Sequence, residues 1–234
     1  EGYFSPWGIE TLSEGAKGDY LTERLTKEAT ALIRKRDQTK PFFLNLCHYT
    51  VHTPIQAPSH LVEKYRAKAK RLGLKEEEAI EEGERLPCLH HGTDRVRRRK
   101  FQSDPVYAAM VETMDDSIGG ILAALDREGL AEDTLVMFTS DNGGLATAEG
   151  SPTCNAPLSE GKGWMYEGGN RVCQIARWPG RIPAGQECSE PTTSPDWYPT
   201  YLEAAGLPLD PEQHVDGKSL LPLLKGEEDP RGPI

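Results

Sequence analysis

The sequence predicts an α/β fold in which helices alternate with the strands of a doubly wound sheet. A helical periodicity of apolar residues over Pro105–Leu125 is followed by the short apolar run Leu135–Phe138. A similar helical pattern precedes the apolar run Pro41–Cys47. A helix followed by a strand, repeated along the chain, is typical of this fold class. Both apolar runs lead into polar turns, and open α/β sheets bind their ligands where strands end.

The first elements are a helix, a strand and a second helix. A helix is expected over Tyr20–Arg36, with Asp19 as its N-cap. Its apolar face consists of Leu21, Leu25, Ala29, Leu32 and Ile33. The apolar run Pro41–Cys47 predicts a strand, and Ser59–Arg71 reads as another helix.

The region that follows is dominated by charge. Glu76–Glu84 is acidic and Arg95–Lys100 is basic, with little apolar periodicity between them. Such a pattern favours a solvated excursion from the core. An alternative is that the basic run contacts a sulfated polymer.

The longest helix is predicted next. Asp104 can cap it, and Pro105 suits the first helical position. Its apolar stripe comprises Tyr107, Met110, Val111, Met114, Ile118, Ile121, Leu122 and Leu125. Gly129 is expected to end it, and a strand over Thr134–Ser140 follows.

The last third of the chain predicts one more strand and one more helix. The strand covers Arg171–Arg177 and ends at Trp178-Pro179-Gly180. Ser194-Pro195-Asp196 opens a helix that Gly206 closes. Leu207–Ile234 reads as a loop with one helical turn near Leu220–Leu224.

Composition limits the classes of function. The 234 residues are 37% hydrophobic and 27% charged, enough to bury the core of one domain or two. A net charge of −10 argues against nucleic acid and against an anionic membrane surface. No apolar run approaches the roughly 18 residues of a transmembrane segment. The five well-spaced cysteines give no disulfide framework.

A candidate metal site lies directly after the apolar run Leu135–Phe138. Asp141 and Asn142, followed by Gly143-Gly144, place a carboxylate and an amide oxygen side by side. Hard oxygen donors suit Ca²⁺ or Mg²⁺ better than a soft metal. The alternative is a plain turn, since all these residue types favour turns.

Two further polar segments carry groups that bind anions. His52 follows the apolar run Pro41–Cys47 in a His-Thr-Pro turn. Lys162 stands between Gly161 and Gly163, where glycine lets the backbone approach a ligand and lysine offers a point charge. A cation, a histidine and a lysine together would make a pocket for a tetrahedral oxyanion. Alternatively, His52 closes a turn and Lys162 is an exposed loop residue.

In this order, the segments resemble the sulfatase family of the arylsulfatase type, within the alkaline phosphatase superfamily. The resemblance runs from about residue 3 to about residue 225. It includes Tyr107–Ile118, Thr139–Gly144, Gly161–Gly169, Trp178–Gly180 and His214–Leu220. The family implies an alkaline-phosphatase-like sheet sandwiched by helices, and a periplasmic, secreted or lysosomal location.

The resemblance also implies roles for four residues. Asp141 and Asn142 match two ligands of a Ca²⁺ ion, with Mg²⁺ as the alternative. Lys162 matches the lysine that binds the sulfate and the leaving oxygen. His52 matches the histidine that hydrogen-bonds the sulfate and protonates the departing alcohol. The substrate is then a sulfated small molecule or carbohydrate, and the polar tips of the four side chains are expected within roughly 10 Å of each other.

The family's nucleophile is a formylglycine made from Cys in Cys-x-Pro-Ser-Arg, and this motif is absent. Only Cys173 has an arginine four residues on, Arg177, and Gln174-Ile175-Ala176 replaces the required residues between them. Cys173 is expected in the core. Residues 1–234 are therefore expected to be one partial catalytic domain, lacking the N-terminal nucleophile segment and the C-terminal subdomain.

Other functions remain as alternatives. A phosphate or phosphonate ester hydrolase of the same superfamily would share the metal pair with a Ser or Thr nucleophile. A non-catalytic fragment would only bind anions or partners. Cys88, His90 and His91 lie close enough in sequence for zinc, but no fourth ligand is evident, so surface histidines are the favoured interpretation.

Overall fold

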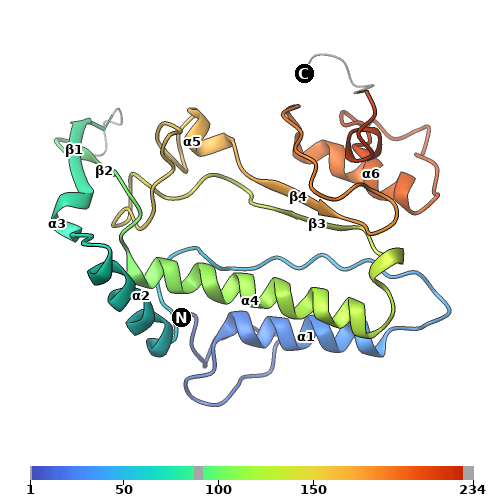
Figure 1. Ribbon diagram of the computed structural model, residues 1–234, viewed down its shortest axis with the longest axis horizontal. Coiled ribbons are helices and arrows are strands. Elements are labelled where there is room, and N and C mark those ends of the chain that lie inside the picture. The colour runs from blue at the N-terminus through green and yellow to red at the C-terminus, as the bar shows by residue number, and fades with distance from the viewer. Residues whose placement is uncertain (1, 87–91, 229–234) are drawn as a thin grey trace. The chain divides into compact units, whose positions relative to one another are not determined.

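The computed structural model describes residues 2–86 and 92–228 (Figure 1). The chain forms two compact units. The first comprises Glu1–Leu125 and Ser140–Cys173, and the second comprises Asp126–Thr139 and Gln174–Ile234. All four predicted site residues belong to the first unit. No helix among the described residues is long and apolar enough to cross a membrane.

The first unit is built mainly on two long helices. α1 spans Leu21–Lys35 and α4 spans Pro105–Arg127, its last two residues falling in the second unit. The two helices lie side by side (Figure 1), and the Thr26 hydroxyl donates a 2.6 Å hydrogen bond to Ser117 Oγ between them. A shorter helix, α2, spans Ser59–Arg71 as predicted.

Aromatic residues form the core of this unit. It consists of Tyr3, Trp7, Tyr20, Leu21 and Met110. The rings of Tyr3 and Tyr20 stack with their centroids 5.6 Å apart. This packing fixes the N-terminal segment against the start of α1 and the first turns of α4.

The two long helices begin in different ways. The Asp104 carboxylate accepts hydrogen bonds from the amides of Val106 and Tyr107, at 2.8 and 3.1 Å, so the predicted cap of α4 is confirmed. The predicted cap of α1 is wrong, because Asp19 Oδ2 instead accepts from the amide of Ala16 at 3.0 Å. Tyr20 takes the N-cap position without a side-chain cap. Leu32, expected in the core, is 60% exposed.

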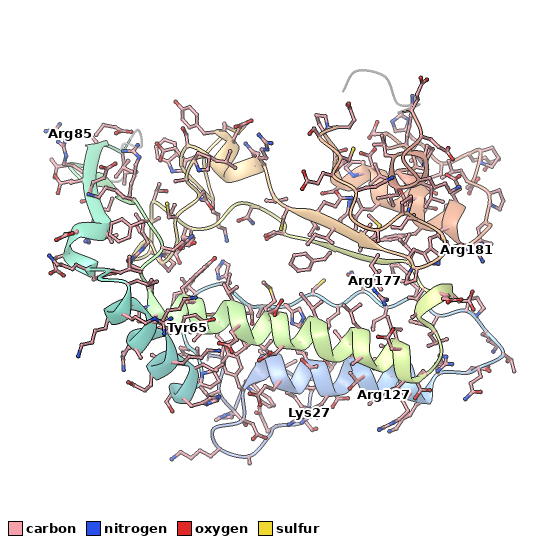
Figure 2. All side chains as sticks on the ribbon, viewed as in Figure 1. Lys27, Tyr65, Arg85, Arg127, Arg177 and Arg181 are labelled. Atoms are coloured by element: carbon pink, nitrogen blue, oxygen red, sulfur yellow. The ribbon has the colours of Figure 1, made fainter. Side chains whose placement is uncertain are left out.

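The charged region forms a hairpin. α3, Glu76–Ala79, leads into β1, Ile80–Arg85, which pairs antiparallel with β2, Arg95–Arg99. Arg85 stands opposite Arg95, and Figure 2 shows Arg85 at the end of β1. The expected solvated excursion therefore contains two regular strands, which ion pairs hold together in place of apolar alternation.

Three arginine side chains of β2 form ion pairs with carboxylates. Arg95 pairs with Glu82 at 3.0 Å, and Arg98 pairs with both Glu84 and Glu160 at 2.6 Å. The Arg99 side chain is 2% exposed and pairs with Glu76 at 2.6 Å. Arg99 also lowers the pKa of the Glu76 carboxyl. This pairing disfavours the alternative in which the basic run binds a sulfated polymer.

The strand expected over Pro41–Cys47 is absent from both sheets of the described chain. Its first three residues are exposed, Phe43 by 73%, and only Leu44–Cys47 alternate between half-buried and exposed positions. A strand is stable only where a neighbour pairs with its backbone, and no described segment forms a ladder with this one. The apolar run therefore keeps its strand-like pattern without becoming a strand.

The described part of the second unit contains a two-stranded ladder and four short helical elements. β3, Val136–Thr139, pairs antiparallel with β4, Gln174–Arg177 (Figure 1). Both strands are shorter than predicted. The expectation that Cys173 lies in the core is wrong, because it precedes β4 and is exposed. The helical elements are η2, Ala131–Asp133, α6, Trp197–Ala204, which follows the 3₁₀ turn η3 at Ser194–Asp196, and α7, Leu221–Leu224.

Candidate active site

The segment with the predicted metal ligands is a turn whose glycines pack against other backbone. The Gly143 amide donates a 2.9 Å hydrogen bond to the carbonyl of Gly169. A Cβ atom at Gly143 would overlap the carbonyl of Gly168, so only glycine fits there. Asp141 is exposed and Asn142 is half-buried. The packed glycines thus fix the backbone that carries both oxygen donors.

Lys162 lies in a loop that contacts this turn directly. Its amide donates a 3.1 Å hydrogen bond to the carbonyl of Gly144. A Cβ atom at Gly161 would overlap the same carbonyl. Further along the loop, the Trp164 indole donates to the hydroxyl of Thr147 at 2.9 Å. The two segments around Asp141 and Lys162, 21 residues apart in the sequence, are therefore neighbours through their backbones.

His52 stands in a turn that a buried tyrosine holds. The His52 amide donates to the carbonyl of Tyr49 at 2.9 Å. The Tyr3 hydroxyl shares its proton between the carbonyls of Tyr49, at 2.5 Å, and His52, at 3.0 Å. Tyr3 is 3% exposed, and burial raises the pKa of its phenol, so the hydroxyl remains a donor.

The side chains of His52 and Lys162 meet. Lys162 Nζ lies 2.7 Å from His52 Nε2. His52 Nδ1 lies 3.0 Å from the carbonyl of Thr53, which can only accept. The imidazole therefore donates from Nδ1 and accepts the lysine proton at Nε2. The Thr53 hydroxyl in turn donates to Glu149 Oε2 at 2.8 Å.

The other two candidates are joined to this pair by backbone only. Within residues 2–86 and 92–228, the structure has no hydrogen bond or ion pair between the side chains of Asp141 or Asn142 and those of His52 or Lys162. The four residues belong to one unit and stand in three segments, of which those that carry Asp141 and Lys162 are in backbone contact. The distance from the metal pair to the histidine–lysine pair stays a prediction.

The donor chemistry of Asp141 and Asn142 fits a hard cation. A carboxylate and an amide oxygen are ligand types that Ca²⁺ takes, among a total of roughly six to eight oxygens. The described residues contain no cluster of three or more His, Cys, Asp or Glu side chains arranged to hold a metal. Asp141 and Asn142 therefore fit as part of a coordination shell that needs further oxygens.

His48, four residues before His52, lies apart from this pair. Its Nε2 is 3.3 Å from the hydroxyl of Ser117 on α4, and burial lowers the pKa of its imidazole. Its Nδ1 is buried and has no hydrogen-bond partner among the described residues. Cys88, His90 and His91, considered above for zinc, lie outside the described residues.

Sequence reasoning missed the residues that support the site. Tyr3 and Glu149 contact the His52 turn from 49 and 96 residues away in the sequence. Neither residue belongs to a motif, so no local signal marks it. Glu149 does have a positive φ of 49°, an uncommon conformation for a residue with a side chain.

Comparison with known proteins places this chain in a family. The sulfatase family model matches residues 2–207. Steryl-sulfatase of Homo sapiens is 34% identical over 223 aligned residues, covering 93% of this chain and 32% of the relative. Arylsulfatase J of Mus musculus is 30% identical over 215 residues, covering 92% of this chain and 30% of the relative. The chain thus spans about a third of the length of these relatives.

Solved structures share the fold. Ps i-CgsB in complex with k-i-k-neocarrahexaose has a TM-score of 0.70 at 29% identity, covering 92% of this chain and 42% of that chain. Phosphonate monoester hydrolase SpPMH from Silicibacter pomeroyi has a TM-score of 0.58 at 22% identity, covering 90% and 41%. The predicted alkaline-phosphatase-like α/β fold is confirmed, in an incomplete form. Since the family model covers most of its residues, the chain belongs to the sulfatase family.

Proposed function

We propose that this chain is the middle and later part of a sulfatase catalytic domain and that the whole protein hydrolyses sulfate esters. The observation that carries the proposal is the 2.7 Å contact between Lys162 Nζ and His52 Nε2. It joins two groups suited to an anionic ester in a chain that belongs to the sulfatase family. The nucleophile, a formylglycine, would come from a segment N-terminal to these residues.

Lys162 and His52 would act on the sulfate and on the leaving group. Attack at sulfur breaks the bond to the alcohol oxygen, which gains negative charge and then a proton. The Lys162 ammonium would stabilise that charge as a preorganised electrostatic group. His52 would be the positioned acid for the departing oxygen in its protonated form, because the Nε2 atom that accepts from Lys162 Nζ in the structure would then carry a proton.

Asp141 and Asn142 would hold a cation beside this pair. Their oxygens favour Ca²⁺, with Mg²⁺ as the alternative. When bound, such an ion polarises the sulfate oxygens as a Lewis acid. The hydrogen bond from the Lys162 amide to the Gly144 carbonyl supports this proposal, because it joins the backbones of the two segments.

The substrate would be a sulfated small molecule or a carbohydrate. The name steryl-sulfatase indicates a steryl ester, whereas the structure of Ps i-CgsB is of a complex with a neocarrahexaose. A sulfate ester of either class would present an anionic group that Lys162 could bind. The choice between the two classes depends on segments beyond the histidine–lysine pair.

The test compares the kcat/KM values of the full-length protein for three kinds of ester. With 4-nitrophenyl sulfate, 4-nitrophenyl phosphate and a phenylphosphonate monoester, we expect the highest kcat/KM for the sulfate. Preference for the phosphorus esters would support the phosphate or phosphonate hydrolase alternative. Absence of turnover with all three would support a non-catalytic anion-binding protein.

Matched variants connect the activity to the site. His52→Ala and Lys162→Ala should each lower kcat/KM by about a hundredfold or more. His60→Ala and Lys70→Ala, at exposed positions of α2, are the controls and should leave kcat/KM unchanged. Equal effects of the site and control variants would contradict the assignment.

A further inference from the structure

One half-buried carboxamide, that of Asn155, bridges the two loops of the candidate site. Asn155 Oδ1 accepts a hydrogen bond from the amide of Gly144 at 3.2 Å. Asn155 Nδ2 donates to the carbonyl of Gly144 at 2.8 Å and to the carbonyl of Glu160 at 2.9 Å. Gly144 closes the turn that carries Asp141, and Glu160 stands two residues before Lys162.

The three hydrogen bonds require an amide side chain. The Gly144 N–H needs an acceptor, while the carbonyls of Gly144 and Glu160 need donors. Asparagine supplies both from one planar group. Aspartate has the same shape but only acceptors, so it would lose both donated bonds and face two carbonyl oxygens.

The surrounding backbone leaves little freedom for another arrangement. The Gly144 carbonyl accepts from the amide of Lys162 at 3.1 Å in addition to the Asn155 amide. A Cβ atom at Gly161 would lie 2.7 Å from Asn155 Nδ2, so the carboxamide packs directly on the lysine loop. Movement of Asn155 would therefore displace both loops together.

Glu160, two residues before Lys162, is also held through its side chain. The Arg98 guanidinium of β2 donates three hydrogen bonds to the Glu160 carboxylate, at 2.6 to 3.0 Å. Glu160 has a φ of 63°, in the left-handed region. Arg98 thus holds the side chain of Glu160, and Asn155 holds its backbone carbonyl.

We infer that Asn155 is a positioning residue that couples the metal turn of Asp141 and Asn142 to the Lys162 loop. The inference rests on the proposed function for the roles of those three residues. Through this carboxamide, the placement of the cation and of the ammonium group depends on one set of hydrogen bonds. Loss of the donors should loosen both loops at once.

The test uses Asn155→Asp and Asn155→Ala in the full-length protein, with Asn45→Asp as the control. Asn45 is an exposed asparagine of the same unit, and its one side-chain hydrogen bond within residues 2–86 and 92–228 is accepted from Cys47 Sγ at 3.7 Å. We expect both Asn155 variants to weaken Ca²⁺ binding about tenfold and to lower kcat by about tenfold to a hundredfold, with KM little changed. Amide exchange should accelerate in peptides covering 143–146 and 160–163, and not in α1 or α2.

A second variant separates positioning from general destabilisation. At saturating Ca²⁺, Asn155→Asp should lower kcat far less in a Lys162→Ala background than in the wild type, because its remaining effect acts through the lysine. An equal fractional loss in both backgrounds would overturn the inference. So would unchanged Ca²⁺ affinity and unchanged exchange in both Asn155 variants.

The outcomes for the proposed function and for this inference are distinguishable. A wild-type protein that turns over no sulfate ester contradicts the proposed function. Exchange and Ca²⁺ affinity need no turnover, so they still report whether Asn155 joins the two loops. Faster exchange in only one of the two loops would overturn the coupling.

Discussion

Lys162 Nζ lies 2.7 Å from His52 Nε2, although 110 residues separate the two in the sequence. The contact forms because two turns with different supports face each other. Tyr3 holds the histidine turn through two carbonyls. Glycine packing and Asn155 hold the lysine loop. The side chains that meet thus depend on groups outside the recognisable motifs.

The first prediction concerns the tyrosine that supports His52. Tyr3→Phe removes the only hydroxyl proton shared by the carbonyls of Tyr49 and His52. The Tyr49 carbonyl keeps the hydrogen bond from the His52 amide, whereas the His52 carbonyl loses the Tyr3 donor, so the free energy of unfolding should fall by about 1 kcal/mol. In the full-length enzyme, kcat should fall about tenfold because His52 loses its fixed turn.

The control for this variant is Tyr49→Phe. The Tyr49 side chain is 57% exposed, so its hydroxyl should contribute little. Urea unfolding and steady-state kinetics measure both effects. A Tyr3→Phe enzyme with wild-type kcat would show that the hydroxyl does not position the histidine.

The second prediction concerns the pH dependence of stability. Burial lowers the pKa of His48 in the folded chain below its ordinary value of 6.5. As the pH falls below that value, the unfolded chain binds the proton first, so stability decreases on acidification. Urea unfolding between pH 7.5 and pH 5 should record the decrease.

A substitution identifies the group responsible. His48→Gln should flatten this pH dependence, whereas His60→Gln, at an exposed position of α2, should preserve it. If both variants keep the wild-type slope, another group titrates in this range.

The third prediction concerns the hairpin. Arg99 is 4% exposed, donates to both carboxylate oxygens of Glu76 and also donates to the carbonyl of Ser151. Lysine cannot reproduce this fork of donors. Arg99→Lys should therefore lower the free energy of unfolding by about 2 kcal/mol.

Arg97→Lys is the matched control on the same strand. Arg97 is exposed, so the change should stay within about 0.5 kcal/mol. Chemical denaturation of the two variants makes the comparison. Equal stabilities would mean that the buried guanidinium contributes nothing beyond its charge.

The fourth prediction concerns these 234 residues alone. They should show no turnover of an aryl sulfate, because covalent catalysis needs a nucleophile that we place outside them. The comparison is with the His52→Ala, Lys162→Ala double variant of the same chain. Activity clearly above that variant would overturn the proposed position of the nucleophile.

The helices were predictable because their signals are local. Ser59–Arg71 matches α2, and the Asp104-Pro105 start of α4 follows from capping and from the fixed backbone angle of proline. The strand over Pro41–Cys47 failed because strand formation depends on a partner that a single segment does not contain. The β1–β2 hairpin was missed because charge pairs, rather than apolar alternation, hold it.

Sequence reasoning named candidate site residues only where a motif carries their chemistry. Asp141, Asn142, Lys162 and His52 stand at polar turns that the sequence marks with glycine or proline. No sequence motif identifies Asn155 or Tyr3, because their hydrogen-bond partners are backbone groups whose positions depend on the folded chain. Their roles follow from geometry alone.

The bound metal of Asp141→Ala and Lys162→Ala full-length enzymes, measured beside kcat, tests the site most directly. Asp141→Ala should lose Ca²⁺ and most activity, with partial recovery when Ca²⁺ is added. Lys162→Ala should keep its Ca²⁺ and lose about a hundredfold or more in kcat, because the ammonium stabilises charge without holding the cation. If Lys162→Ala loses the metal while Asp141→Ala retains it, or if neither variant changes kcat, the account of this site is wrong.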